Sequence, residues 1–281
     1  MINQIKTIVF LGALSTILVG LGGYLAPGYI YFFGALAICL NFGAYFWSDK
    51  IVLKMHRASE VSKNQAPWLH NIVENLAKEA NIPKPKIYVI SEAQPNAFAT
   101  GRNPEHGVVA VTEGIVDLLT ERELSGVIAH ELAHIKNRDI LISTIAAVMA
   151  SAVTFIANIM QISAIFGGTR DDDEGGSPLG MFALAFLAPI AATLVQLGIS
   201  RSREYHADAI AAQINGDPEA LASALEKLNY SSKTIPSHVQ PATASLFIVN
   251  PLYGQKSFLN LFSTHPPVQE RVKKLRNMKI Q

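Results

Sequence analysis

The sequence predicts a mainly α-helical integral membrane protein, in which four transmembrane helices carry a cytoplasmic α+β domain with a small sheet. Its 281 residues are 49% hydrophobic and only 16% charged, which is more apolar than a typical soluble domain. The apolar residues form two long blocks, and basic residues gather on one side of each block. The net charge of +1 gives no reason to expect a nucleic-acid partner. With one cysteine, Cys39, a disulfide framework is excluded.

The first apolar block has no charged residue from Thr7 to Ser48. It is about twice as long as the roughly 20 residues that cross a bilayer, and Pro27-Gly28 interrupts it in the middle. A cleaved signal peptide is the alternative for its first half, but the charged start is weak and a second span follows at once. We therefore assign residues 1–48 to a transmembrane hairpin with spans at about 5–25 and 29–47.

The second apolar block predicts another transmembrane hairpin over residues 140–199. Its spans lie at about 140–166 and 179–199, joined by the acidic, glycine-rich loop 167–178. A calcium loop would need ligand spacing that this segment lacks. A solvated connector is the better interpretation.

Basic residues set the predicted orientation, because cytoplasmic flanks of membrane spans carry an excess of Lys and Arg. The first connector carries no charge, and the second is acidic with a single arginine. Both chain termini and the segments 49–139 and 200–281 should therefore be cytoplasmic, with loop 167–178 on the opposite side. The basic flanks are Lys50, Lys54, Arg57, Lys63, Lys136, Arg138, Arg201 and Arg203.

Local patterns predict the elements of the cytoplasmic parts. Thr120 and Glu123 have capping-box spacing, and the helix that they begin has no proline or glycine near its end, so we expect it to run directly into the third span. Residues 231–264 give mixed signals and receive no element. The other expected elements are a helix at 66–80, strands at 86–90 and 107–111, a helix at 200–214 ended by Asn215-Gly216, a short helix from Asp217-Pro218, and a last helix at about 267–277.

His130-Glu131-Leu132-Ala133-His134 carries the clearest chemical signal. Residues four apart share one face of a helix, so both imidazoles can bind one ion while Glu131 points elsewhere. The alternative is a pair of solvated histidines on a surface helix. A catalytic zinc commonly takes a further protein ligand from another segment. The second membrane hairpin would return residues 200–210 to this place, and Glu204 and Asp208 share one face there.

These motifs together resemble the HtpX family of membrane-bound zinc metalloproteases. This family belongs to the gluzincin group and is related to the CAAX prenyl endopeptidases. The resemblance extends over nearly the whole chain and includes the four-span layout. The matching motifs are HELAHIKNRD at 130–139, SRSREYHADA at 200–209, NAFATG at 96–101, AVTEGIV at 110–116 and STHPP at 263–267.

The resemblance implies a zincin-like metalloprotease domain that holds one Zn²⁺ per chain. It implies that His130, His134 and Glu204 are the metal ligands and that Glu131 is the general base. It also implies that Asp208 orients His130 from outside the ligand set; a plain surface charge is the alternative for Asp208.

Three further residues are candidates for substrate binding. Asn96 and Ala97 resemble the edge segment that pairs with substrate backbone in this group, although a simple loop with Phe98 in the core fits as well. His265 is a candidate cleft residue or transition-state donor, and helix capping is its alternative. His206 should point away from the metal face, and His56, His70, His106 and His238 are expected to be solvent-exposed.

The sequence thus predicts a zinc endopeptidase of the cytoplasmic (inner) membrane. The resemblance implies membrane-protein quality control, with unfolded or membrane proteins as substrates and the lipid bilayer as partner; nothing indicates an oligomeric state. A protease with its motif inside the bilayer is disfavoured by the polar residues 136–139. A metal transporter or sensor would need ionisable residues in its spans, and an inactive scaffold would not need an intact Glu131.

Overall fold

The structure is a computed structural model that describes residues 2–25, 27–166, 193, 201–235, 243, 246–249 and 265–279. The predicted loop 167–178 lies outside the described residues, as does the predicted span 179–199 except for residue 193. The helices are α1 (Ile2–Leu25), α2 (Ile30–Met55), α3 (Pro67–Ala80), α4 (Glu113–Leu118), α5 (Glu121–Lys136), α6 (Ile140–Phe166), α8 (Arg201–Asn215), α9 (Pro218–Thr234) and α10 (Val268–Arg276), with short 3-10 turns at Pro27–Tyr29 and Pro104–His106. The strands are β1 (Ser59–Glu60), β2 (Lys86–Ile90), β3 (Ala97–Thr100) and β4 (Val108–Thr112).

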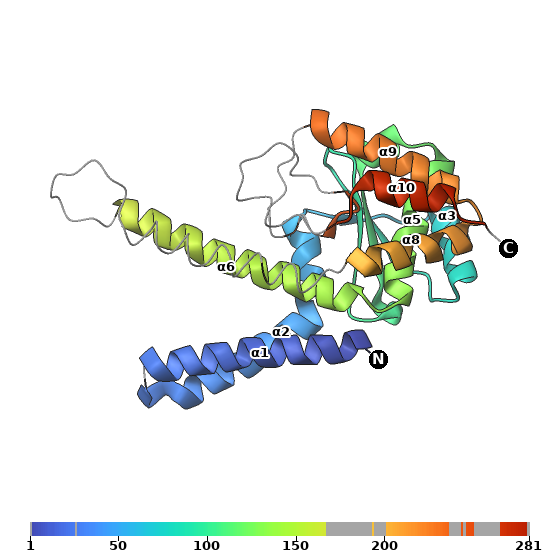
Figure 1. Ribbon diagram of the computed structural model, residues 1–281. Coiled ribbons are helices and arrows are strands. Elements are labelled where there is room, and N and C mark those ends of the chain that lie inside the picture. The colour runs from blue at the N-terminus through green and yellow to red at the C-terminus, as the bar shows by residue number, and fades with distance from the viewer. Residues whose placement is uncertain are drawn as a thin grey trace.

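Helices α1, α2 and α6 project from one side of a globular part that holds the sheet and the remaining helices (Figure 1). The first three predicted spans coincide with these helices. Within the described part of the chain, α2 alone is long and apolar enough to cross a bilayer, judged by its length and composition. The four-span layout therefore stays a prediction.

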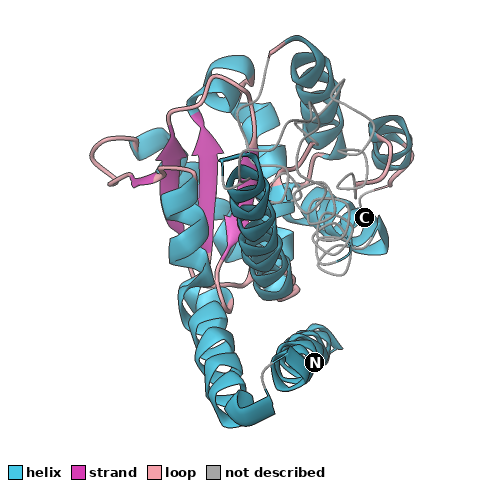
Figure 2. Ribbon diagram, turned by 90° about the vertical axis from the view of Figure 1, so that its left-hand side faces the viewer, coloured by secondary structure: helices cyan, strands magenta, loops and turns pink. Residues whose placement is uncertain are grey.

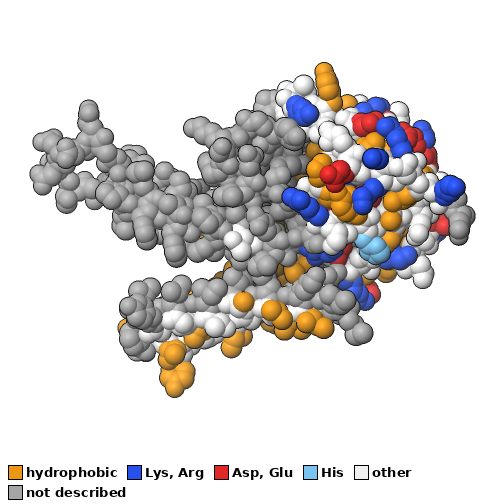
Figure 3. Space-filling view, viewed as in Figure 1, with side chains coloured by type: hydrophobic (Ala, Val, Ile, Leu, Met, Phe, Trp, Pro, Cys, Tyr) orange, Lys and Arg blue, Asp and Glu red, His pale blue; other side chains and the backbone are white. Residues whose placement is uncertain are grey.

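On the face shown in Figure 3, the coloured side chains along the α1–α2 pair are mainly hydrophobic, whereas most of the charged side chains lie on the globular part. Many large hydrophobic side chains of these two helices are exposed, including Tyr31 at 90% and Ile38 at 71%. Inside the pair, the Asn41 side-chain amide donates to the Ser15 hydroxyl over 2.7 Å. The two helices thus pair partly buried polar side chains with each other and present hydrocarbon outward, as membrane helices do.

A four-stranded mixed sheet forms the base of the globular part (Figure 2). Its strand order is β1-β2-β4-β3; β2 and β4 are parallel, and the two outer strands pair antiparallel to their neighbours. Strand β2 has the predicted bounds, and β4 lies one residue later than predicted. No local pattern predicts β1, and for β3 only the family resemblance of Asn96 and Ala97 indicates an edge segment. Strand β3 matters most for the site, because it is an edge strand that packs against α5 and α6.

Helix α5 is the central helix of the globular part. The predicted capping box is present at its start, because Thr120 and Glu123 each accept from the other's backbone N–H. Eleven of its sixteen residues are buried, and it packs against the sheet and against α3, α8 and α9. A Cβ on Gly126 would lie 2.6 Å from the backbone N of Leu221, so only glycine permits the observed contact with α9.

The expected continuous helix through residues 120–166 is wrong. Helix α5 ends at Lys136, and α6 begins at Ile140. Arg138 adopts a left-handed conformation with φ of 58°; its N–H bonds to Ile135 O, and the Asp139 N–H bonds to His134 O. This is the Schellman arrangement that commonly ends helices. The left-handed position of this motif is usually a glycine. Because Arg138 occupies it here, the sequence carries no signal for the helix break.

Candidate metal centre

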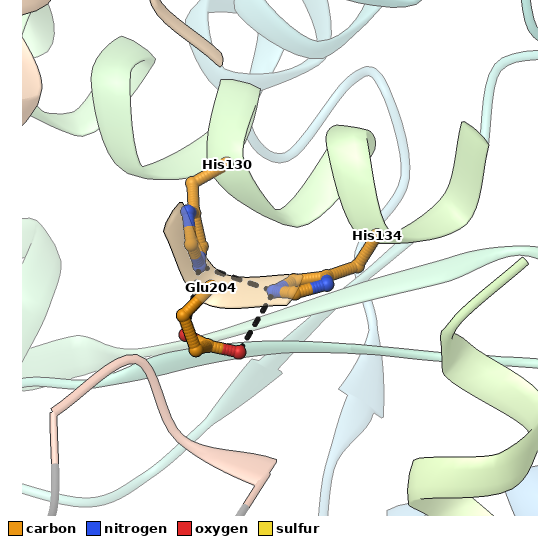
Figure 4. A group of neighbouring side chains, drawn as sticks. All are labelled: His130, His134 and Glu204. Carbon is orange, nitrogen blue, oxygen red and sulfur yellow. Dashed lines mark hydrogen bonds and ion pairs between the residues drawn. The ribbon is translucent and has the colours of Figure 1, made fainter. Parts of the chain in front are cut away.

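Helix α5 presents His130 and His134, and α8 brings Glu204 against them (Figure 4). The two Nε2 atoms lie 3.1 Å apart. Glu204 reaches each of them with one carboxylate oxygen, Oε2 at 3.6 Å from His130 Nε2 and Oε1 at 3.5 Å from His134 Nε2. His130 and Glu204 are buried, and His134 is partly buried. Residues seventy positions apart therefore point their donor atoms at a common place.

The donor atoms have the separations that a tetrahedral zinc site requires. With metal–ligand bonds of about 2.0–2.1 Å, two ligands of a tetrahedral zinc lie about 3.3 Å apart. The separations of 3.1, 3.5 and 3.6 Å are close to this value. Two imidazole nitrogens and a carboxylate also form a donor set of the kind that zinc proteases use. The residues present thus fit the metal.

A carboxylate and an arginine support His130 from behind. Asp208 Oδ1 lies 3.0 Å from His130 Nδ1, and Arg271 contacts both Asp208 oxygens through nitrogens at 2.7 and 2.9 Å. Burial raises the pKa of Asp208, but Arg271 and His130 outweigh it and lower that pKa to about 2. Burial lowers the pKa of His130, yet Asp208 and Glu204 raise it to about 9. Because a carboxylate only accepts hydrogen bonds, the Nδ1–H of His130 points to Asp208, and Nε2 faces His134 and Glu204.

Glu131 is buried beside the ligands without belonging to the ligand group; its exposed fraction is 3%. It lines the same cavity of about 30 Å³ as the ligands do, and it has a backbone hydrogen bond with Ala99 on β3. Burial raises the pKa of Glu131, while His130 and His134 oppose that rise. A carboxylate in this place is suited to accepting a proton.

His265 closes another side of the cavity. Its Nδ1 lies 3.0 Å from Glu204 Oε2, and because a carboxylate only accepts, Nδ1 carries the proton. Burial raises the pKa of Glu204, but His265, His130 and His134 hold it well below its usual range. His265 Nε2 is buried and has no hydrogen-bond partner among the described residues. That nitrogen is therefore free for a ligand in the cavity.

Comparison with known proteins agrees with this geometry. The sequence profile of peptidase family M48 matches residues 63–279. The chain belongs to peptidase family M48. M48 enzymes are metalloproteases, so this chain is a metalloprotease, and its family implies a divalent metal. In the described structure, the group His130, His134 and Glu204 could hold that metal.

Curated relatives of this M48 chain are named Protease HtpX homolog. The protein from Desulforapulum autotrophicum is 52% identical over 98% of this chain and 90% of its own length. The protein from Desulfatibacillum aliphaticivorans is 53% identical over 97% of this chain and 89% of its own length. The protein from Syntrophobacter fumaroxidans is 51% identical over 98% of this chain and 99% of its own length. The solved structure of S. mikatae Ste24p matches with a TM-score of 0.49 and 18% identity, over 97% of this chain and 65% of that one.

The predicted substrate edge of the M48 domain is a strand. Residues Ala97–Thr100 form strand β3, so the simple loop is wrong, but its placement of Phe98 in the core is right, because Phe98 is fully buried. Segment 246–249 contacts this edge: the Ile248 N–H donates to Ala97 O over 3.3 Å, and the Asn96 amide donates to Val249 O over 3.1 Å. Residues 246–248 also line the metal cavity.

The other predicted histidines lie at different depths. His206 is exposed, as its position on α8 predicts, and His106 is exposed too. Full exposure is wrong for His56 and His70. His56 packs between the rings of Phe98 and Phe247, and His70 Nε2 bonds to a backbone carbonyl over 2.8 Å. His238 lies outside the described residues.

Two functional candidates, Arg271 and Asp139, were missed from the sequence. The sequence predicts a last helix at about 267–277 and gives Arg271 no role in the site, yet this side chain is fully buried. Its signal was its position on the apolar face of α10 with Val272 and Leu275. Asp139 lies 3.2 Å from His134 Nδ1; an unbroken helix would have carried it elsewhere, so no sequence signal indicated this contact. Asp208, by contrast, is buried against His130, and its alternative as a surface charge is wrong.

Proposed function

We propose that the chain is a zinc-dependent endopeptidase of the cytoplasmic membrane that hydrolyses misfolded or membrane proteins at the cytoplasmic face. The observation that carries this proposal is the convergence of His130, His134 and Glu204, whose donor atoms all lie within 4.8 Å of one another. These residues surround a buried glutamate, in a chain that belongs to a metalloprotease family.

The proposed chemistry assigns a task to each buried group. His130, His134 and Glu204 hold the ion, which when bound supplies the Lewis acidity that activates water and polarises a carbonyl. Glu131 accepts a proton from the attacking water and passes it to the leaving amine. Burial raises the pKa of Glu131, which strengthens it as a base.

Substrate would lie along β3 in an extended conformation. Edge strands bind peptides through main-chain hydrogen bonds, which suits unfolded segments of varied sequence. Ala97 O and the Asn96 amide now contact residues 248–249, so an incoming peptide would replace those contacts. His265 Nε2 would contact the substrate from the opposite side of the cavity.

The membrane assignment rests on the α1–α2 pair and on charge. The exposed apolar surface of these helices is of the kind that marks membrane contact, and the basic residues that follow α2 favour a cytoplasmic end. We propose four spans, with the divisions 1–48, 49–139, 140–199 and 200–281, both termini cytoplasmic and the lipid bilayer as partner. Quality control of membrane proteins under stress is the corresponding role.

The test replaces the proposed base and keeps the ligands. Purified full-length Glu131→Gln in detergent, loaded with zinc, should retain one equivalent of zinc and lose about 10²–10⁴-fold in casein cleavage. Glu121→Gln is the matched control, because Glu121 is exposed on the same helix; it should keep full activity.

Two results would contradict the proposal in different ways. Zinc-dependent cleavage that persists in Glu131→Gln would remove Glu131 from the mechanism. A parent protein that takes up no zinc and cleaves nothing would refute the zinc endopeptidase and favour a transporter or a scaffold.

A further inference from the structure

The two imidazoles of the centre are oriented alike. Each turns Nε2 inward, toward the other histidine and Glu204, and Nδ1 outward toward a carboxylate. For His130 the carboxylate is Asp208, at 3.0 Å from Nδ1. For His134 it is Asp139, whose Oδ2 lies 3.2 Å from Nδ1. The family resemblance accounts for the first of these carboxylates and leaves the second unexplained.

The break between α5 and α6 places Asp139. Because Arg138 is left-handed, the chain folds back over the last turn of α5, and the Asp139 N–H donates to the His134 carbonyl over 3.0 Å. Backbone and side chain of Asp139 therefore both contact the same histidine. Its exposed fraction is 3%, so the carboxylate cannot rely on water for compensation.

A cation from α8 completes the arrangement. Arg203 Nη1 lies 4.0 Å from Asp139 Oδ1, and Arg203 directly precedes Glu204. Arg203 is one of the basic residues that flank a predicted membrane span, and its side chain is only 14% exposed. Each imidazole thus has a carboxylate behind it and an arginine behind that carboxylate, Asp208 with Arg271 and Asp139 with Arg203.

We propose that Asp139 is a positioning residue that holds His134 in the tautomer with the proton on Nδ1 and the Nε2 lone pair toward the metal. A carboxylate behind a ligating histidine fixes the ring and makes the ligand more basic, and losing such a partner costs about 10–100-fold in metal affinity. The proposal rests on the proposed metal centre and adds the group that orients its second histidine.

The test measures metal binding by the full-length protein in detergent. Asp139→Asn keeps the shape and removes the charge, and Asp139→Ala removes the acceptor. Zinc affinity, from competition with a chromophoric chelator, should fall about 10–100-fold in both. The visible spectrum of the cobalt-loaded variants should differ from that of the parent, and Asp139→Glu should restore part of the affinity. A purely structural role would not alter the cobalt spectrum.

Asp217→Asn is the matched control. It removes a carboxylate paired with Arg122 that does not line the metal cavity, so it should leave zinc affinity unchanged. Parent-like affinity and spectrum in Asp139→Asn would overturn the proposal. An equal loss in Asp217→Asn would also overturn it, because the effect would then be general.

If the Asp139 variants do not fold, the tautomer of His134 can be measured directly in the parent protein. Nitrogen NMR of the zinc-loaded, ¹⁵N-histidine-labelled protein should find His134 bound through Nε2 and protonated on Nδ1. Binding through Nδ1 would refute the proposal. A parent that binds no metal refutes the proposed function itself, whereas a metal-binding parent with an unaffected Asp139→Asn refutes this inference alone.

Discussion

Replacing Arg271 by methionine should destabilise the whole globular part. Arg271 is fully buried, contacts both oxygens of Asp208 at 2.7 and 2.9 Å, and donates to Ile248 O over 3.0 Å. The pKa of Asp208 falls from 3.8 to about 2, which corresponds to about 2–3 kcal/mol of stabilisation of its ionised form. A buried pair that loses one partner commonly costs about 3–5 kcal/mol, so both routes give a cost of a few kcal/mol.

Thermal unfolding in detergent, followed by far-ultraviolet circular dichroism, measures that cost. A loss of 3–5 kcal/mol should lower the Tm by about 6–20 °C in a chain of this size. The double variant Asp208→Asn, Arg271→Met leaves no unpaired buried charge and should unfold above the single variant. A Tm of Arg271→Met equal to that of the parent would refute the reasoning, as would a double variant whose loss equals the sum of the two single losses.

Three further results should follow. Acid should destabilise the protein: burial raises the pKa values of Asp208 and Glu123, but ionic and hydrogen-bond partners lower both to about 2, from ordinary values of 3.8 and 4.5. This stability is therefore complete above about pH 5 and is lost as the pH falls toward 2; a Tm unchanged from pH 5 to pH 2.5 would contradict this. Gly126→Val should lower stability by about 1–3 kcal/mol, because its Cβ would meet the Leu221 backbone at 2.6 Å; chemical denaturation that finds no loss would mean that α9 can move. Arg138→Gly should raise stability by up to about 1 kcal/mol, since a left-handed non-glycine residue costs about 1–2 kcal/mol and glycine's added unfolded-state freedom returns part of it; a lower Tm would indicate that the arginine side chain contributes elsewhere.

Helices whose first residues carry a recognisable capping sequence were predicted correctly from the sequence. The capping box at Thr120 begins α5 as expected. Asp217 begins α9 by accepting from the Ala220 N–H, with Pro218 in the first turn. The short apolar run at residues 87–90 predicted β2. The separation of His130 from His134 was equally local, because four residues along a helix return to the same face.

Tertiary contacts determined what the sequence reading missed. Strand β3 has only four residues and pairs with β4, which follows it in the chain, so its strand character comes from its partner. Arg271 is charged and lies in a helix rich in Lys and Arg; only the buried Asp208 across the fold makes it a core residue. Segment 246–249 contacts the metal cavity without any regular pattern of its own.

The break after α5, which the sequence did not predict, bears directly on the candidate metal centre. A continuous helix would have carried residue 139 onward along the axis of α5, away from the side chain of His134. The left-handed Arg138 instead returns the chain over the last turn, so that Asp139 contacts His134 and α6 departs in a new direction. One helix break thus sets the orientation of a candidate ligand and the exit of a predicted membrane span together. Asp139 directly precedes α6 and contacts His134. A substitution that shifts the first turn of α6 should therefore change the orientation of His134 through Asp139 more than it changes the position of Glu204.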